Sequence, residues 1–425
     1  MKRYEDYKNS GVLWIGEVPS HWEIVPFKYY TNVIMGQSPN GEDIKSEGET
    51  PFMQGNAEFG NLYPSTIYFC EACSKFSRIG DILMSVRAPV GEINLSDKVY
   101  GIGRGLCSIS AKHCNRQYLW YFLKKSKNDL NIYANGSTFT AITIQVLKSF
   151  KLILPPLPEQ QAIASFLDAK TKPIDGIIAK REKQIELLEE MKSAIISRAV
   201  TKGLNPEAKM KDSGIEWIGE IPEGWDVIKT SFLFQLIGSG TTPSKNAPNY
   251  AEEGLYWLQT GDFNDNYVND TSKYITDLAV QNCSALTLFP KGCLVIAMYG
   301  ASIGKLGILN IESYTNQACC VLGREKNILI KFAFYAYKAG RKALINESRG
   351  GGQPNISQDI ISHFKIPVPP INEQCNVIAY LDSETSKIDT RITKRRKQIE
   401  LLQEYKQALI TAAVTGKIDV RELNS

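Results

Sequence analysis

The strongest constraint on the fold is an internal repeat. The phrase SGVLWIGEVPSHW at residues 10–22 returns as SGIEWIGEIPEGW at residues 213–225, with eight of the thirteen positions identical. A second pair, PPLPEQQAIASFLD at 155–168 and PPINEQCNVIAYLD at 369–382, lies near the end of each half. The first pair is 203 residues apart and the second pair 214, so the second copy is longer by 11 residues. The chain therefore contains two copies of one structural plan.

The segments between these shared phrases differ in sequence and have a mixed α/β pattern. Short apolar runs at 82–90, 151–155 and 294–298 are bounded by Gly, Pro or Asn, which is typical of strands. Aromatic-rich stretches at 116–126 and 331–344 carry apolar residues at helical spacing. Each half is therefore expected to form a compact domain with its own core.

Each variable segment is followed by a long amphipathic stretch. Residues 159–200 carry apolar side chains spaced by threes, fours and multiples of seven, and the second copy repeats the pattern. At about 1.5 Å per residue, a helix over this range is about 63 Å long, longer than an ordinary globular helix. We predict an antiparallel helix pair. The apolar residues expected to form its seam or to dock partners are Ile174, Ile177, Leu188, Met191, Ile195, Ile388, Leu402, Tyr405 and Leu409.

Two features of these helices leave alternatives open. Polar residues interrupt the apolar stripe at matched positions, Arg181 and Gln184 in the first copy and Arg395 and Gln398 in the second. Either the seam rotates away and these residues are solvated, or they fix the register of the helices, as buried polar groups do in coiled coils. Pro173 has no proline counterpart in the second copy, so the first helix is expected to kink or restart nearby.

Composition narrows the class of protein. The chain has 425 residues, 43% of them hydrophobic, and a formal net charge of +4, which predicts more than one core and permits contact with nucleic acid without requiring it. Residues 1–11 are charged and no run approaches 18 apolar residues, so we expect a soluble cytoplasmic protein without membrane contact. Cys70 and Cys73 form one C-x-x-C without a second ligand pair at matching spacing. His113 and Cys114 are the remaining candidates to complete a site, and we expect no metal.

This organisation resembles the specificity subunit of Type I restriction-modification systems, and the resemblance covers essentially the whole chain. It rests on the two variable segments, the repeated PPLPEQQ and PPINEQC openings, the twin KQIELL helices and the WIGE phrase. It implies an α+β fold in which two similar target recognition domains are joined by two long helices forming an antiparallel coiled coil in a pseudo-two-fold circular arrangement. The implied segments are recognition domains at 1–154 and 204–368, spacer helices at 155–203 and 369–418, and a tail at 419–425.

The resemblance also implies a function and partners. Each recognition domain reads one half of a bipartite site in double-stranded DNA, while the helix pair sets the spacing and docks two methyltransferase subunits. Restriction subunits join them in the full complex. The chain itself is expected to hold no cofactor, and S-adenosylmethionine, ATP and Mg²⁺ are expected on the partner subunits.

The motifs of an enzyme are missing from the sequence. The two Pro-Pro pairs, in LPPL and VPPI, lack the preceding amide or acid and the following aromatic residue of DNA amino-methyltransferases. GIGRG at 101–105 and GASIGKL at 300–306 miss the spacing of nucleotide-binding loops. We therefore expect a DNA-recognition subunit that is not catalytic by itself. The alternatives are a DNA methyltransferase or nuclease of unfamiliar type, and a coiled-coil scaffold that never touches DNA.

Candidates for DNA contact lie on Gly-rich turns at matched places in the two halves. Arg and Lys suit guanine and phosphates, whereas Asn and Gln suit adenine. The candidates are Gln54, Asn56, Arg87, Arg104, Asn135, Ser137, Thr138, Gln259, Asp262, Tyr299, Lys305, Asn316, Arg349, Gln353 and Asn355. The Trp phrase is nearly the same in two domains that should read different half-sites, so we expect it to pack each domain against the helices.

Overall fold

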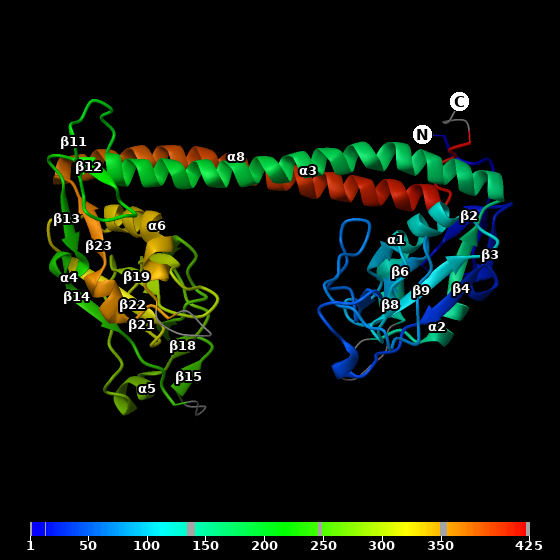
Figure 1. Cartoon of the computed structure of the whole chain (residues 1–425), viewed down its shortest axis with the longest axis horizontal. Coiled ribbons are helices and arrows are strands. Elements are labelled where there is room, and N and C mark those ends of the chain that lie inside the picture. Colours follow the sequence, from blue (N-terminus) through cyan, green and yellow to red (C-terminus); the bar gives the residue numbers. More distant parts are fainter. Residues whose placement is uncertain (1, 13, 134–140, 245–248, 349–354, 422–425) are drawn as a thin grey trace. The chain divides into compact units, whose positions relative to one another are not determined.

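The computed structural model describes residues 2–12, 14–133, 141–244, 249–348 and 355–421. The chain forms two compact units, which we call unit 1 (residues 1–181 and 397–425) and unit 2 (residues 182–396). Each unit contains one variable segment together with part of each long helix (Figure 1).

Unit 1 begins with two small antiparallel pairs that tie the Trp phrase to the rest of the unit. β1 (Tyr7–Asn9) pairs with β2 (Glu17–Pro19), and β3 (Glu23–Pro26) pairs with β10 (Lys151–Leu154) along its whole length. Trp14 stacks on Phe150 with ring centroids 5.0 Å apart. Trp22 is fully buried, and its indole nitrogen donates to Oε2 of Glu159 on the first long helix at 2.9 Å. The expected packing of the Trp phrase against the helices is confirmed in this unit.

The main sheet of unit 1 is antiparallel with strand order β4-β9-β6-β7, and a short parallel pair, β5-β8, lies beside it. Helix α1 follows the sheet, and the hydroxyl of Tyr121 donates to Asp168 of the long helix at 2.6 Å. The elements of this unit are β1 (Tyr7–Asn9), β2 (Glu17–Pro19), β3 (Glu23–Pro26), η1 (Phe27–Tyr29), β4 (Thr31–Met35), η2 (Gly41–Asp43), β5 (Phe52–Met53), β6 (Ile82–Ser85), β7 (Ile93–Leu95), β8 (Gly101–Ile102), β9 (Leu106–Ala111), α1 (Arg116–Ile132), α2 (Ile144–Ser149) and β10 (Lys151–Leu154).

Unit 2 repeats this plan and adds elements to it. Its main sheet has strand order β14-β22-β19-β20-β17, and Tyr335 donates to Asp382 at 2.7 Å as Tyr121 does to Asp168. The elements are β11 (Met210–Asp212), β12 (Glu220–Pro222), β13 (Asp226–Lys229), α4 (Thr230–Leu233), β14 (Phe234–Ser239), β15 (Tyr250–Ala251), β16 (Leu255–Leu258), β17 (Asn266–Val268), β18 (Tyr274–Ile275), α5 (Asp277–Asn282), β19 (Leu294–Ala297), β20 (Leu306–Leu309), β21 (Tyr314–Thr315), β22 (Cys319–Glu325), α6 (Ile330–Asn346), α7 (Gln358–His363) and β23 (Lys365–Val368). Strands β15, β17 and β18 and helix α5 are the additions.

The two long helices are α3 (Leu157–Lys202) and α8 (Ile371–Val414). Within unit 2, Lys192 bonds to Asp389 at 2.6 Å and Arg396 to Glu189 at 3.0 Å, so the two helices run side by side in opposite directions. This confirms the predicted antiparallel pair in this unit. Pro173 lies inside α3, and the helix continues through it, so the expected restart was wrong.

The described residues contain no helix that is both long and apolar enough to cross a membrane. They also contain no group of three or more His, Cys, Asp or Glu side chains placed to hold a metal ion.

Candidate nucleic-acid interface

In unit 1, three glycine-containing loops meet at one end of the main sheet. Loop 36–39 follows β4, loop 54–56 follows β5, and loop 103–105 joins β8 to β9. Backbone hydrogen bonds link the loops. A Cβ atom on Gly36 would lie 2.2 Å from the carbonyl oxygen of Gly103, so the two backbones approach this closely only because position 36 is glycine.

Three residues from these loops and Arg87, which follows β6, lie together on the surface of unit 1. Nε2 of Gln54 donates to Oγ of Ser38 at 2.7 Å, and the backbone nitrogen of Arg104 donates to the same hydroxyl at 3.3 Å. Arg87 lies beside them because the residue before it donates its backbone N–H to the third loop at 2.9 Å. Gln54, Arg87 and Arg104 are exposed, and Asn56 is half-buried nearby. We call Ser38, Gln54, Arg87 and Arg104 the unit 1 cluster.

Unit 2 builds the same backbone frame. A Cβ atom on Gly240 would lie 1.8 Å from a carbonyl oxygen of β21, so here too a glycine allows the loops to meet. The backbone N–H of Met298 donates to the loop after β21 at 2.8 Å, and Ile356 donates to Met298 at 2.8 Å. The corresponding bonds of unit 1, donated by Val86 and Ile142, are both 2.9 Å long.

The matched positions of this frame carry different side chains in unit 2. Tyr299 and Gln317 stand where unit 1 has Arg87 and Arg104, and Thr242 donates its hydroxyl to Oε1 of Gln317. Burial, with the nearby Cys319 thiol contributing less, raises the pKa of Tyr299, so its phenol remains a neutral hydrogen-bond donor at neutral pH. Amide and hydroxyl groups thus replace the two guanidinium groups.

The other predicted contacts of unit 2 have varied surroundings. Asn355 is exposed and pairs with Tyr299 through a backbone bridge, whereas Asn316 and Lys305 are half-buried. Oδ1 of Asn316 accepts the backbone N–H of Ala318 at 3.1 Å, so this amide also shapes its own turn. We call Thr242, Gln259, Tyr299, Gln317 and Asn355 the unit 2 cluster.

Asp262 has a structural function in its loop. Its two carboxylate oxygens accept the backbone N–H groups of Gln259 at 2.7 Å and Ser272 at 3.0 Å. Both oxygens therefore help to hold the loop that presents the half-buried side chain of Gln259.

Sequence reasoning missed Ser38, Thr242 and Gln317 as members of the clusters. The motifs GQSP at 36–39 and GTTP at 240–243 match each other in the repeat, and this match was the available signal for the first two. Five of the predicted contacts lie outside the described residues, namely Asn135, Ser137, Thr138, Arg349 and Gln353.

The predicted apolar residues of the long helices divide into two groups. Ile174, Ile388 and Leu409 are buried, as expected for a seam, and Leu188, Ile195 and Leu402 are half-buried. In contrast, the side chains of Ile177, Met191 and Tyr405 are 42%, 48% and 55% exposed, which leaves them available to a partner.

In unit 2, exposed apolar residues line a groove of about 500 Å³ on the helix pair. Leu187 and Met191 lie on α3, and Arg391, Lys394 and Arg395 approach from α8. An apolar floor with a basic wall suits an amphipathic, acidic protein surface. The corresponding positions of unit 1, Leu401 and Tyr405, are also exposed.

Comparison with known proteins places both halves in one class. A family model described as the Type I restriction modification DNA specificity domain matches the chain twice, over residues 19–187 and 222–401. The chain therefore belongs to the family of Type I specificity subunits, which are the non-catalytic members of restriction-modification complexes.

Individual relatives agree with this assignment. The chain is 40% identical over 201 residues to the putative type I restriction enzyme MjaX specificity subunit of Methanocaldococcus jannaschii, an alignment that covers 46% of each chain. It is 27% identical over 432 residues to the MjaVIII specificity subunit of the same organism, covering 96% of this chain and 95% of the relative. The fold is also similar to a solved structure described as the structural basis of complex assembly and conformational transition of the type I R-M system. The alignment covers 94% of this chain and 99% of the other chain, with a TM-score of 0.69 and 17% identity, and so supports the fold.

Proposed function

We propose that each unit contacts one half of a bipartite DNA site through its cluster. The observation that carries this proposal is the pair of backbone frames, which have the same loops and nearly equal hydrogen bonds but different side chains at matched positions. A frame that is kept while its exposed side chains change is suited to presenting two different sets of contacts. Packing alone would not require the exposed positions to differ.

The chemistry of the clusters indicates which bases each unit favours. In unit 1, the guanidinium groups of Arg87 and Arg104 suit the O6 and N7 atoms of guanine or the phosphates, and the amide of Gln54 suits adenine. In unit 2, Gln259 and Gln317 carry amides and Tyr299 carries a hydroxyl, a set that favours adenine and offers less positive charge. We therefore propose that the unit 1 half-site contains guanine and that the unit 2 half-site is richer in adenine.

The helix pair is proposed to set the separation of the half-sites and to hold two methyltransferase subunits. The apolar groove at Leu187 and Met191 supports a docking role, because a solvated helix has no need for exposed apolar residues beside three basic ones. S-adenosylmethionine, ATP and Mg²⁺ would be held by the methyltransferase and restriction subunits, in the cytoplasm, where the complex meets its DNA.

The proposal is tested by DNA affinity measured with the chain assembled on its methyltransferase subunits. The probe is a duplex that carries the site identified by methylation mapping, and binding is followed at several salt concentrations. Replacing Arg104 by Ala should weaken binding by about 1–3 kcal/mol if it contacts a base, or reduce the salt slope by about 1 if it contacts a phosphate. Lys112→Ala is the matched control, because Lys112 is exposed just after β9, at the opposite end of that strand from Arg104. Equal effects of the two substitutions would contradict the proposal.

A further inference from the structure

Each unit fixes its Trp phrase with a glutamate at the start of a long helix. In unit 1 the carboxylate of Glu159 accepts hydrogen bonds from Trp22 at 2.9 Å and Tyr4 at 3.1 Å, and it contacts Nε2 of His21 at 2.7 Å. Glu159 is only 8% exposed. A buried carboxylate of this kind is stable because each desolvated oxygen is supplied with donors.

The two ends of the described chain cover this carboxylate in unit 1. Tyr4 is 5% exposed and lies edge-on to Trp22, with ring centroids 5.5 Å apart. The guanidinium of Arg421 lies over the Tyr4 ring, 4.9 Å from its centre. The backbone nitrogen of Asp419 donates to the carbonyl of Lys2 at 2.9 Å, so both segments are held together over the site.

Unit 2 has the same glutamate and a fully buried Trp, but among its described residues none equivalent to Tyr4 covers the carboxylate. Trp225 donates to Glu373 at 2.8 Å, and Gly224 stands where unit 1 has His21. Residues 203–209 connect α3 directly to β11 and carry no aromatic side chain. As a result Glu373 is exposed, and a pocket of about 440 Å³ opens above it.

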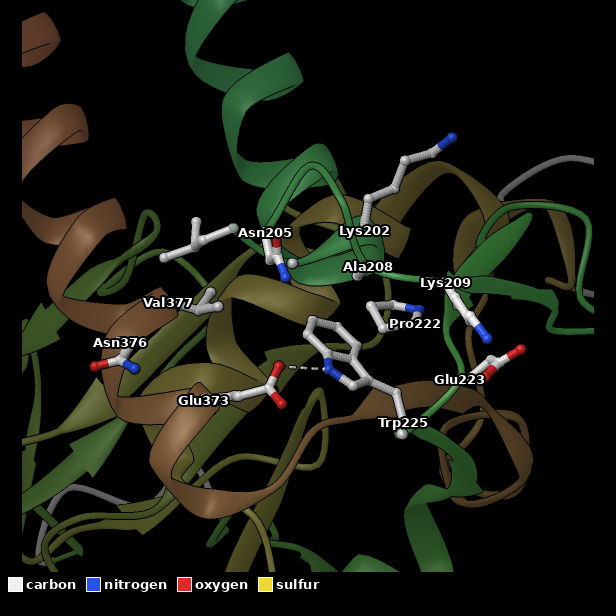
Figure 2. A pocket seen from close by; sticks show the side chains of 13 residues that line it. Lys202, Asn205, Ala208, Lys209, Pro222, Glu223, Trp225, Glu373, Asn376 and Val377 are labelled. Carbon is white, nitrogen blue, oxygen red and sulfur yellow. Dashed lines mark hydrogen bonds between the residues drawn. The ribbon is translucent and has the colours of Figure 1, made fainter.

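Figure 2 shows how the pocket is built. Trp225 borders the pocket but is itself fully buried, and the Glu373 carboxylate points toward the indole nitrogen. Val377 and Pro222 are buried, whereas Leu204 is 42% exposed and supplies apolar surface. The pocket also includes Lys202 and Lys209 among its lining residues. The volume lies in the range of sites that hold small organic groups.

We propose that this pocket binds a tyrosine side chain carried on a segment of another polypeptide. Unit 1 supplies the argument for the occupant, because a tyrosine on a chain segment fills the equivalent place and donates to the equivalent carboxylate. The exposed side chain of Leu204 offers apolar surface to the ring, and the free acceptor capacity of Glu373 accepts the phenol. Lys202 and Lys209 oppose a cationic ligand, so a neutral donor is favoured.

This proposal does not rest on the DNA-binding proposal, because none of the residues that line the pocket belongs to the unit 2 cluster. Failure of one therefore leaves the other standing.

The test is the affinity of the full chain for a fluorescently labelled, end-capped peptide with the sequence of residues 2–6, KRYED, measured by anisotropy. Saturable binding is expected. The same peptide with Phe in place of Tyr should bind about tenfold more weakly, because it loses a hydrogen bond to a charged acceptor. This comparison uses the unaltered protein and does not depend on the folding of any variant.

Two variants locate the site. Ala208 lines the pocket, so A208W should place an indole in it and abolish peptide binding. Glu207 is exposed and is not among the lining residues, so E207W should bind as the original chain does. The proposal is overturned if no saturation is reached, if the Tyr and Phe peptides bind equally, or if A208W binds as well as E207W.

Discussion

Glu159 and Glu373 occupy the same place in the two units. Removing each side chain in turn therefore tests how much a buried carboxylate contributes to the stability of its unit. Glu159 is 8% exposed and holds Tyr4 and Trp22, which are themselves 5% and 0% exposed. Glu373 is exposed and holds Trp225. The substitutions Glu159→Ala and Glu373→Ala therefore remove chemically identical groups from different environments.

The expected loss of stability in each variant follows from the number of hydrogen-bond donors left without an acceptor. In Glu159→Ala the Tyr4 hydroxyl and the Trp22 indole N–H both remain buried, and each such group costs about 1–3 kcal/mol. The loss in unit 1 should therefore be about 2–6 kcal/mol, and about 3 kcal/mol within this range is roughly a hundredfold in the opening equilibrium. Glu373→Ala leaves one buried donor, the Trp225 indole N–H, and water can take the place of the exposed carboxylate. The loss should therefore be about 1 kcal/mol, or roughly fivefold.

Hydrogen exchange measured by mass spectrometry resolves the two units separately in the full chain. Amides of α1 should exchange about a hundredfold faster in Glu159→Ala, and amides of α6 about fivefold faster in Glu373→Ala. The helix of the unaltered unit serves as the internal control in each case. Equal effects of the two substitutions would refute the reasoning, because burial and donor count would then not determine the cost.

Three further predictions concern the spacer, a buried lysine and the docking groove. Inserting seven residues after both Arg181 and Arg396 lengthens the helix pair by about 10 Å. Methylation mapping should then find the same half-sites about three base pairs further apart. A changed half-site with an unchanged gap would contradict the proposal that the helix pair sets the spacing. Burial, followed by the charge of Lys406, lowers the pKa of Lys124 from 10.5 to about 8. Between these two pH values the unfolded chain therefore binds one more proton than the folded chain, so the free energy of unfolding should rise with pH. Lys124→Met should remove this rise, which urea unfolding curves recorded from pH 7 to 10 would measure. Met191→Glu places a charge in the apolar groove and should weaken capture of the methyltransferase subunit at least tenfold in a pull-down titration, whereas Ala179→Glu, on an exposed position outside the groove, should not.

The repeated architecture could be predicted because the repeated phrases and the apolar spacing both indicate the same structure. The shared phrases identify two copies, and the apolar spacing identifies the long helices to within a few residues of α3. The restart expected at Pro173 was wrong for a physical reason. Pro173 and Ala169, four residues earlier, are both exposed, so the carbonyl that loses its hydrogen bond lies on the solvent face and water can satisfy it.

The candidate interface could be predicted only in part, because its contacts join residues far apart in the chain. The bond from Gln54 to Ser38 spans 16 residues, and the bond from Thr242 to Gln317 spans 75. Local turn signals identify the loops but not which of them meet. Asp262 shows a second limit, because a carboxylate on a Gly-rich turn has the same sequence pattern whether it contacts a ligand or its own backbone.

The periodicity of the long helices also could not separate seam residues from docking residues. Ile174 and Ile177 both fit the apolar pattern, yet one is 8% and the other 42% exposed. The difference arises from where the partner helix lies, which a one-dimensional pattern does not contain.

The central claim is that each unit specifies one half of the DNA site, and base-resolved mapping of DNA methylation tests it most directly. The measurement compares cells that express the chain and its methyltransferase subunit with cells that carry one of two double substitutions. Arg87→Ala with Arg104→Ala should relax or abolish recognition at one half-site only, and Gln259→Ala with Gln317→Ala should affect only the other. If either pair altered both half-sites, or if neither pair altered the methylated sequence, the two units would not each specify one half of the site.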